Sequence, residues 1–386
     1  MNKKIYFDNA ATKPVRPEVF EAMKPLLMEE YGNPSSIYEL ARNSKKLLEK
    51  ARKQVADAIG ALPSEIFFTS GATEANNWAL SGVIETVKGA SKKHIITTSI
   101  EHHAVLHTCK YLEKTHGCDV TYLPVDEFGL INTDDLIRAI RSDTVIISVM
   151  FVNNEIGTVQ PIKEVGEIAR AHGILFHTDA VQALGFLPID VGSQNIDLMS
   201  LSAHKIHGPK GIGALYIRKG TKLPPFIHGG GQEGGRRAGT ENMSGISGFG
   251  KAAELVSSEL EQTVLHLKKL QDKIIDGVLK IPHSRLNGSR EHRVAGNVNV
   301  CFEFIEGESL LLLLDMKGIF ASSGSACTSG SLDPSHVLLA IGLPHEIAHG
   351  SLRISLSKYN TESEVDVLLA ELPAIVKRLR EMSPLY

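Results

Sequence analysis

The segment with the clearest chemical potential is residues 200–213, SLSAHKIHGPKGIG, in which Lys205 stands between small polar residues and a glycine–proline turn. An apolar run at 196–201 precedes it and predicts a strand. Enclosure at a strand end favours the neutral form of a lysine, and a neutral amine can form a Schiff base with an aldehyde such as pyridoxal 5'-phosphate (PLP). Ser202 and His204 could hold a phosphate beside it. An exposed lysine in a turn is the alternative.

Two further strand ends carry residues that suit the same cofactor. Asp179 closes the apolar run 175–179, where a carboxylate could bond a protonated pyridine nitrogen or simply cap the next helix. Residues 70–74, SGATE, follow another strand-like segment. Backbone N–H groups at such a turn, with the Thr73 hydroxyl, suit a phosphate. Neither feature is specific alone, but together with Lys205 they indicate one site.

Three more polar residues follow or lie within predicted strands. His102 comes after the strand at 94–98 and could stack on a cofactor ring and carry protons. Asn154 comes after the strand at 144–150 and could reach a ring substituent. Arg353 alternates with apolar residues and could bind a substrate carboxylate bidentately, although a solvated arginine on a strand face fits the same pattern.

Cys327 lies in a run of small residues, ASSGSACTSG at 321–330. Buried cysteines usually have large apolar neighbours, so we interpret Cys327 as an accessible nucleophile. Cys109, Cys118 and Cys301 form no CxxC pair and no metal-ligand spacing with it. We therefore expect free thiols and a cytoplasmic protein.

Residues 345–349, HEIAH, match the zinc-peptidase pattern H-E-x-x-H. That pattern needs a long helix, but Pro344 precedes the match, Gly350 follows it, and a strand-like segment comes next. No third histidine follows at the spacing of a metzincin. We interpret the match as coincidence, which metal analysis can test.

The elements that must position these residues alternate between strand and helix. Strand-like segments at 5–8, 65–69, 94–98, 119–123, 144–150, 175–179 and 196–201 are separated in several places by helical ones, such as 17–30 and 73–86. This α/β alternation predicts a mostly parallel sheet that binds ligands at the carboxyl ends of its strands. A helix at 250–279 then leads to a second domain, whose last helix begins with a capping box at 361–364.

Composition excludes some classes of function. The 386 residues are 42% hydrophobic, enough for a large core in two or three domains. A net charge of −3 gives no reason to expect nucleic acid or an anionic membrane as a partner. The longest aliphatic run, 310–314, is too short to span a bilayer, and the N-terminus lacks the apolar core of a signal peptide.

The combination resembles the cysteine desulfurases of the NifS/IscS type, in the class V aminotransferase group of PLP enzymes with the type I fold. The resemblance runs nearly end to end. It rests on DNAAT at 8–12, GNPSS at 32–36, TSGATE at 69–74, VNNEIG at 152–157, Asp179 with Gln182, SAHK at 202–205, GGGQE at 229–233 and SGSAC at 323–327.

The resemblance implies a type I PLP-dependent transferase fold. Its large PLP-binding domain, residues 16–250, would hold a mostly parallel seven-stranded sheet. A smaller α/β domain, residues 1–15 and 251–386, would carry the cysteine loop.

The resemblance also implies a role for each site residue. Lys205 would carry the covalent link to PLP, His102 would stack on the ring, and Asp179 would bind the pyridine nitrogen. The other cofactor contacts would be Gln182 at the phenolic oxygen and Asn154 near the same edge. The phosphate would be held by Ala72, Thr73, Ser202 and His204, and Ala203 would be a further cofactor-binding residue. Thr240 would reach the phosphate of the partner subunit, which implies a homodimer. Arg353 and Asn33 would bind the substrate carboxylate.

By the same resemblance, the activity would be removal of sulfur from L-cysteine. The freed Lys205 would remove the Cα proton, and the Cys327 thiolate would attack the substrate sulfur, leaving a persulfide and L-alanine. Cys327 would pass the sulfur to an iron–sulfur scaffold or another acceptor, where it could transiently bind a cluster. No resident metal is expected.

Two positions depart from the family pattern: Tyr38 replaces a usual histidine, and Ala41 a usual glycine. The chain ends at 383–386 without the longer tail of the housekeeping branch, so docking through such a tail is not expected. A selenocysteine lyase, or another PLP-dependent lyase or aminotransferase acting on a small amino acid, remains an alternative that would not need Cys327. A non-catalytic phosphate- or partner-binding protein, which would not be yellow with PLP, is another.

Overall fold

Seven strands form the central sheet, in the spatial order β2–β8–β7–β6–β5–β3–β4. The computed structural model describes residues 4–87, 93–323, 334–384 and 386. The seven strands are β2 (Ile66–Thr69), β3 (His94–Thr98), β4 (Asp119–Leu123), β5 (Thr144–Ser148), β6 (Leu175–Asp179), β7 (Leu198–Ser202) and β8 (Gly213–Ile217). β8 runs antiparallel to both of its neighbours, and the other pairs are parallel. The predicted α/β fold with a mostly parallel sheet is confirmed.

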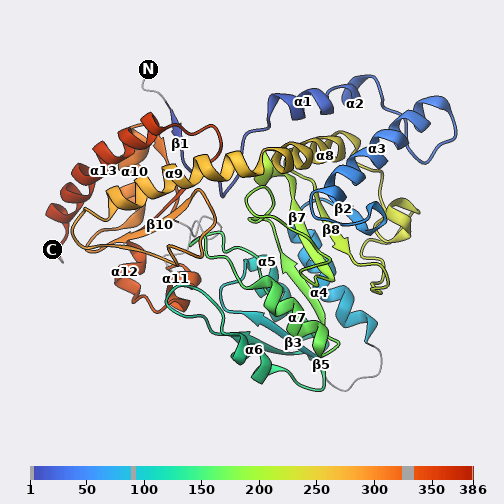
Figure 1. Cartoon of the computed structure of the whole chain (residues 1–386), viewed down its shortest axis with the longest axis horizontal. Coiled ribbons are helices and arrows are strands. Elements are labelled where there is room, and N and C mark those ends of the chain that lie inside the picture. The colour runs from blue at the N-terminus through green and yellow to red at the C-terminus, as the bar shows by residue number, and fades with distance from the viewer. Residues whose placement is uncertain (1–3, 88–92, 324–333, 385) are drawn as a thin grey trace.

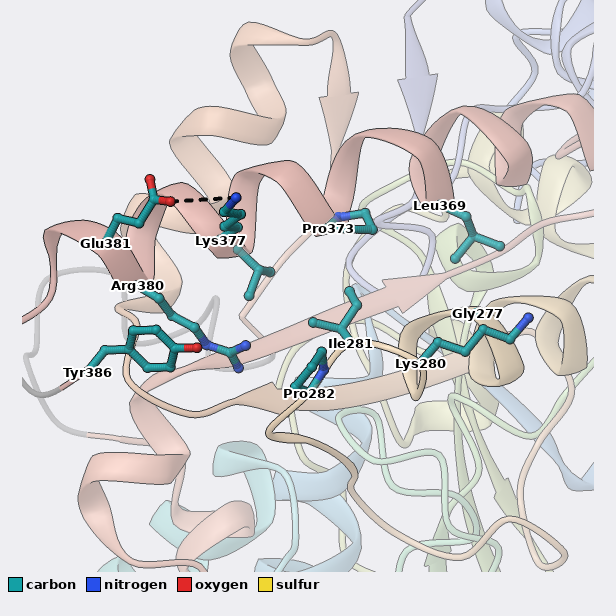
Figure 2. A pocket seen from close by; sticks show the side chains of 11 residues that line it. Gly277, Lys280, Ile281, Pro282, Leu369, Pro373, Lys377, Arg380, Glu381 and Tyr386 are labelled. Carbon is teal, nitrogen blue, oxygen red and sulfur yellow. Dashed lines mark ion pairs between the residues drawn. The ribbon is translucent and has the colours of Figure 1, made fainter.

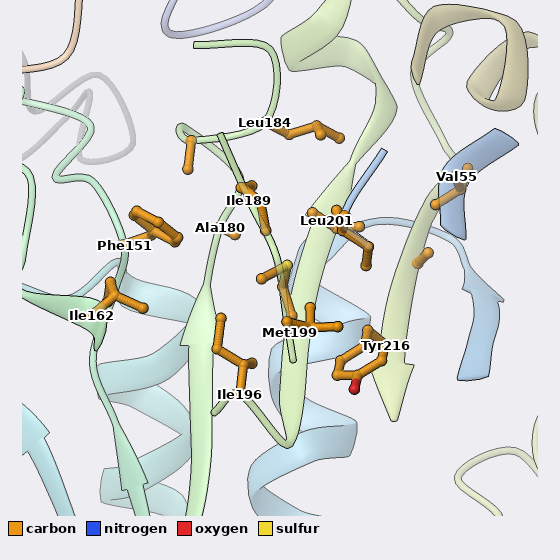
Figure 3. Packing of buried hydrophobic residues seen from close by; sticks show 14 of the residues in the cluster. Val55, Phe151, Ile162, Ala180, Leu184, Ile189, Ile196, Met199, Leu201 and Tyr216 are labelled. Carbon is orange, nitrogen blue, oxygen red and sulfur yellow. The ribbon is translucent and has the colours of Figure 1, made fainter. Parts of the chain in front are cut away.

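Helices cover both faces of this sheet (Figure 1). One face packs against α4 (Ala72–Thr86) and α5 (His103–His116), and the other against α3 (Glu39–Asp57), α7 (Ile162–Ala171) and α8 (Met243–Ser258). Strand residues alternate between the two faces: Met199 belongs to the apolar cluster on one side, and Leu198 to the cluster on the other. Figure 3 shows Met199 and Leu201 of β7 beside Tyr216 of β8 in the first cluster.

The C-terminal third is built on smaller sheets. β9 (Ser284–Leu286), β10 (Asn297–Phe302) and β12 (Ser351–Ser355) form an antiparallel sheet, and β1 (Ile5–Tyr6) pairs in parallel with β11 (Ile319–Phe320). α9 (Leu260–Val278), α10 (Gly307–Met316) and α13 (Glu362–Met382) contribute to one apolar cluster with these strands. The N-terminal segment thus joins the C-terminal part of the chain, and a bridge from Asp8 to Ser355 extends the contact.

Two predicted helices are each divided in the structure. The helix predicted at 17–30 is α1 (Pro17–Met23) and α2 (Pro25–Met28), because Pro25 has no N–H group to continue the first helix. The helix predicted at 250–279 begins earlier, since the Asn242 side chain caps α8, and it is interrupted at Glu259, where φ is −107°. α9 continues beyond that residue, so the pair spans both parts of the molecule (Figure 1).

The remaining helices are short: α6 (Thr133–Ala139), α11 (His336–Ala340) and α12 (His345–His349), with the 3-10 turns η1 (Pro63–Glu65), η2 (Ala203–Ile206) and η3 (Gln232–Gly235). The capping box predicted at the start of the last helix is present between Thr361 and Glu364. Among the residues described, no helix combines the length and the apolar character needed to cross a membrane.

Candidate active site

The carboxyl ends of β6 and β7 and the N-terminus of α4 surround a cavity of about 600 Å³. Ten of the predicted site residues line it: Ala72, Thr73, His102, Asn154, Asp179, Gln182, Ser202, His204, Lys205 and Arg353. Ala203 is fully buried directly beside it. The cavity therefore brings together residues that are widely separated along the chain.

Lys205 lies in η2, directly after β7. Its Nζ donates hydrogen bonds to the carbonyl oxygens of Ala10, at 2.5 Å, and Ala11, at 2.8 Å. The amine is thus held inside the site by the N-terminal segment and is not a solvated turn lysine. No role for this segment was predicted from the sequence, although its DNAAT pattern at 8–12 was the available signal.

Asp179 is 6% exposed and occupies the end of β6. The Asn76 side chain donates to its Oδ2 at 2.7 Å, and the Val181 N–H donates to its Oδ1 at 3.1 Å. Residues 181–186 form turns, so Asp179 does not cap a following helix. This contact with Asn76 was not predicted from the sequence, because nothing in the spacing of Asn76 along α4 points to β6.

The other end of the cavity is suited to an anion. The first turn of α4 directs its N–H groups there, and Ser202, His204 and Lys210 lie around it. A Cβ on Gly213 would lie 2.8 Å from the backbone of Gly71, so β8 packs against this turn only because residue 213 has no side chain. Burial, helped by nearby lysines, lowers the pKa of His204 to about 4, which leaves its ring neutral at pH 7.

His102 is the N-cap of α5. Its Nδ1 accepts a hydrogen bond from the Ala104 N–H at 3.1 Å. The proton of a neutral ring must therefore reside on Nε2. This contact fixes both the tautomer and the orientation of a ring that lines the cavity.

Arg353 is buried at the centre of β12 and lines the cavity from the C-terminal side. Its Nη2 forms a 2.8 Å ion pair with Asp8 Oδ1, and its Nη1 donates to the Asn154 carbonyl at 3.2 Å. The solvated arginine considered from the sequence is excluded. Asp8 was not predicted as a partner, because it lies at the opposite end of the chain.

Among the described residues, the predicted Asn33 and Thr240 lie away from this cavity. Asn33 Oδ1 accepts a hydrogen bond from the Ser35 N–H in an exposed turn. Thr240 lines a separate hollow of about 170 Å³, which shares Ser70 and Gly211 with the main cavity. Cys327 lies outside the described residues. The roles predicted for these three remain predictions.

The donor set fits PLP. The lining of the cavity includes a buried carboxylate, a helix N-terminus suited to an anion, and a lysine amine. Met150, Val152 and Val181 add apolar surface suited to a flat ring. These residues match the needs of a cofactor with a pyridine nitrogen, an aldehyde and a phosphate.

Two other features do not compete with this site. The HEIAH segment forms only the five-residue α12, and the residues described contain no group of three or more His, Cys, Asp or Glu side chains placed to hold a metal. A hollow of about 620 Å³ lies beside α13 (Figure 2). None of the predicted site residues lines it; its walls are formed by Gly277, Lys280, Ile281, Pro282, Leu369, Pro373, Val376, Lys377, Arg380, Glu381 and Tyr386.

Fold and site together define a PLP-dependent enzyme of the type I fold. A family model described as aminotransferase class-V matches residues 5–368, and the chain belongs to this family. Cysteine desulfurase IscS of Methanosarcina thermophila is 61% identical over 384 residues, covering 100% of this chain and 95% of the relative.

Solved structures agree. A NifS-like protein is 42% identical to this chain, with a TM-score of 0.92. The match covers 98% of this chain and 100% of the NifS-like chain. SspA in complex with cysteine is 41% identical with a TM-score of 0.82, covering 93% and 100%. The resemblance to cysteine desulfurases of the NifS/IscS type is confirmed.

Proposed function

We propose that this protein is a PLP-dependent cysteine desulfurase that converts L-cysteine to L-alanine and transfers the sulfur to its own Cys327. The observation that carries the proposal is that the Lys205 amine, the Asp179 carboxylate and the Arg353 guanidinium line one cavity. Full-length relatives that bear the name cysteine desulfurase support the assignment.

When bound, PLP supplies an aldehyde that joins amines and a ring that accepts the electron pair left by loss of a Cα proton. Lys205 would hold the cofactor at rest and, once displaced by the substrate amine, would take the Cα proton on Nζ. Asp179, oriented by Asn76, would keep a proton on the ring nitrogen. The N–H groups at the start of α4, with Ser202 and His204, would bind the phosphate.

Arg353 would bind the substrate carboxylate. A guanidinium can present two parallel N–H donors to a carboxylate, which orients the substrate as well as holding it. Asp8 already accepts from Nη2, so an incoming carboxylate would share the guanidinium with Asp8 or displace it. Asn33 is proposed as a second carboxylate contact.

Cys327 would be the sulfur acceptor within the enzyme. Ser322 exchanges backbone hydrogen bonds with Arg353, and the Ser351 hydroxyl donates to the Ser323 carbonyl, so the chain entering the cysteine segment is anchored at the substrate site. Four residues of chain span at most roughly 14 Å, which gives Cys327 the covalent reach to meet a substrate bound at Arg353.

The sulfur transfer would be a nucleophilic displacement at the substrate sulfur, with the carbon as the leaving group. The Cys327 thiolate would form a bond to the substrate sulfur as the carbon–sulfur bond breaks, and the carbon would leave with the electron pair. Protonation of that carbon would give alanine, and the enzyme would retain a persulfide. An iron–sulfur scaffold or another acceptor would then receive the sulfur in the cytoplasm.

We also infer a homodimer. Several large apolar side chains are exposed along the segment from α1 to the start of α3: Phe20, Leu27, Met28, Tyr31 and Ile37, the last 90% exposed. A second copy would cover them and could bring its exposed Thr240 towards the phosphate end of the site. Domains of residues 16–250 and of residues 1–15 with 251–386 are proposed as well, in keeping with the separate apolar clusters of the central and smaller sheets.

The test is alanine release from L-cysteine by the PLP-loaded protein, with Lys205→Ala and Cys327→Ala as variants. We expect a yellow wild-type protein, loss of the covalent link in Lys205→Ala, and retention of the cofactor but loss of turnover in Cys327→Ala. Radiolabelled sulfur should remain on the Cys327 peptide of the wild type. Full activity of Cys327→Ala would instead favour a selenocysteine lyase or another PLP-dependent lyase.

A further inference from the structure

Glu101 is a fully buried carboxyl group behind the active site. Its Oε1 accepts two hydrogen bonds, from the Met150 N–H at 2.7 Å and from the Thr98 hydroxyl at 2.9 Å. Its Oε2 is buried, and none of the residues that the structure describes forms a hydrogen bond with it. The Glu101 side chain does not line the cavity. Met150, which it contacts, and His102, which follows it in the chain, both do.

The bond to Met150 completes the sheet where its strands end. Val149 and Phe151 donate their N–H groups to carbonyls of β6, so the N–H of Met150 faces the opposite side, towards β3. β3 ends at Thr98, and the Met150 N–H donates to the Glu101 side chain beyond that strand end. The Glu101 carboxyl occupies that place, and it thereby holds the backbone of a residue that forms part of the cavity wall.

The backbone of Glu101 is held as well. The His336 ring nitrogen Nε2 hydrogen-bonds the Glu101 carbonyl at 3.0 Å, and the Asn153 amide donates to the Ile100 carbonyl at 2.9 Å. The turn that delivers His102 is therefore fixed through both the side chain and the main chain of residue 101.

We propose that Glu101 is a positioning residue for the reaction: its buried carboxyl joins the ends of β3 and β5 and so fixes His102 and Met150 against the cofactor. This inference rests on the proposed function, because it assigns Glu101 a role at the same PLP site.

The protonation state follows from the surroundings. Burial, with a smaller contribution from the Asp179 charge on β6, raises the pKa of Glu101 to about 8. The Cys109 thiol on α5 also faces it and is held protonated by burial, and His336 of α11 contacts only its carbonyl. Glu101 is therefore mainly uncharged at pH 7.

The experiment compares Glu101→Gln and Glu101→Ala with the wild-type holoenzyme. Glutamine keeps an acceptor for Met150 and Thr98 without a charge, whereas alanine keeps neither. We expect kcat for alanine release to stay within about threefold in Glu101→Gln and to fall about tenfold or more in Glu101→Ala. The visible circular dichroism of bound PLP, which reports how the ring is held, should change only in Glu101→Ala.

Glu65→Ala is the matched control. Glu65 is also a buried carboxyl that accepts from backbone N–H groups, those of Leu62 and Lys219, but it lies next to the edge strand β2, away from the cavity. Glu65→Ala should lose stability and leave the circular dichroism of PLP unchanged.

A second measurement uses the apoprotein. Because the folded pKa of Glu101 lies above its unfolded value, the folded state binds the extra proton, and the contribution of Glu101 to wild-type stability should fall as pH rises from about 5 through 8. Glu101→Gln should lose that part of the pH dependence. Three results would overturn the proposal. The first is an unchanged pH dependence of stability in Glu101→Gln, and the second is a kcat for Glu101→Gln as low as that of Glu101→Ala. The third is a wild-type circular dichroism of PLP in Glu101→Ala. A wild type that releases no alanine would instead refute the proposed function and leave the dichroism and stability tests valid.

Discussion

Asn76 and Asp179 form a buried amide–carboxylate pair, 2.7 Å between Nδ2 and Oδ2, that joins α4 to the end of β6. The pair links the two ends of the cavity, because α4 also begins at the proposed phosphate site. One helix therefore positions both the anion-binding turn and the partner of the ring-binding carboxylate.

Asn76→Ala tests that relationship. Removing the donor leaves Asp179 Oδ2 without its partner, and we expect stability to fall by about 1–3 kcal/mol and kcat to fall about tenfold. Urea unfolding and alanine-release kinetics measure the two effects. Asn77→Ala, on the next residue of the same helix but outside the cavity, should change kcat little; an equal loss in both variants would contradict the role of the pair.

Arg353→Lys should weaken substrate binding more than turnover. A lysine retains the charge but cannot offer the fork of parallel donors to a carboxylate. We expect KM for L-cysteine to rise about tenfold or more, with a smaller change in kcat. Steady-state kinetics decide this, with Arg285→Lys on β9 as the control. An unchanged KM would remove Arg353 from the substrate site.

Gly213→Ala should disturb the proposed phosphate site, although residue 213 itself does not line the cavity. The added Cβ would meet the Leu201 carbonyl at 2.5 Å and the Gly71 backbone at 2.8 Å, so the turn before α4 must move. We expect a loss of about 1–3 kcal/mol in stability and weaker PLP binding, measured by titrating the apoprotein with PLP. Gly231→Ala, where a Cβ meets nothing within 4 Å, should bind PLP as the wild type does.

Lys13→Met should stabilise the protein near neutral pH. Burial, with the nearby Lys205 charge, lowers the pKa of Lys13 to about 7, and its Nζ lies 4.2 Å from the Phe186 ring centroid. Because the folded pKa lies below the unfolded value, the unfolded state binds more protons at this group, and the destabilisation caused by Lys13 decreases as pH rises from about 7 to 10.

We therefore expect a gain of a few kcal/mol in Lys13→Met at pH 6.5 that shrinks towards pH 10. Urea unfolding at several pH values measures it. The exposed Lys53→Met should show no such trend. A gain that does not vary with pH would show that packing rather than charge is responsible.

Much of the fold could be predicted because its signals are local. Apolar runs of about five residues separated by helical periodicity indicated a parallel sheet, and polar residues at the ends of those runs indicated Lys205 and Asp179. Pro25 is a local signal for a helix break, but the interruption at Glu259 was harder to predict because it depends on contacts with distant residues. Glu259, for example, accepts from Arg16 and Lys358, which come from distant parts of the chain.

By itself, the sequence determined the α/β class, the position of the lysine and aspartate at strand ends, and the family motifs. Each of these depends on residue type and on spacing within a short stretch. Only the tertiary structure decided the partners: Asn76 for Asp179, Asp8 for Arg353, the carbonyls of Ala10 and Ala11 for Lys205, and Glu101 for Met150. Such partners are set by which strands and helices lie side by side, and local periodicity does not encode that order.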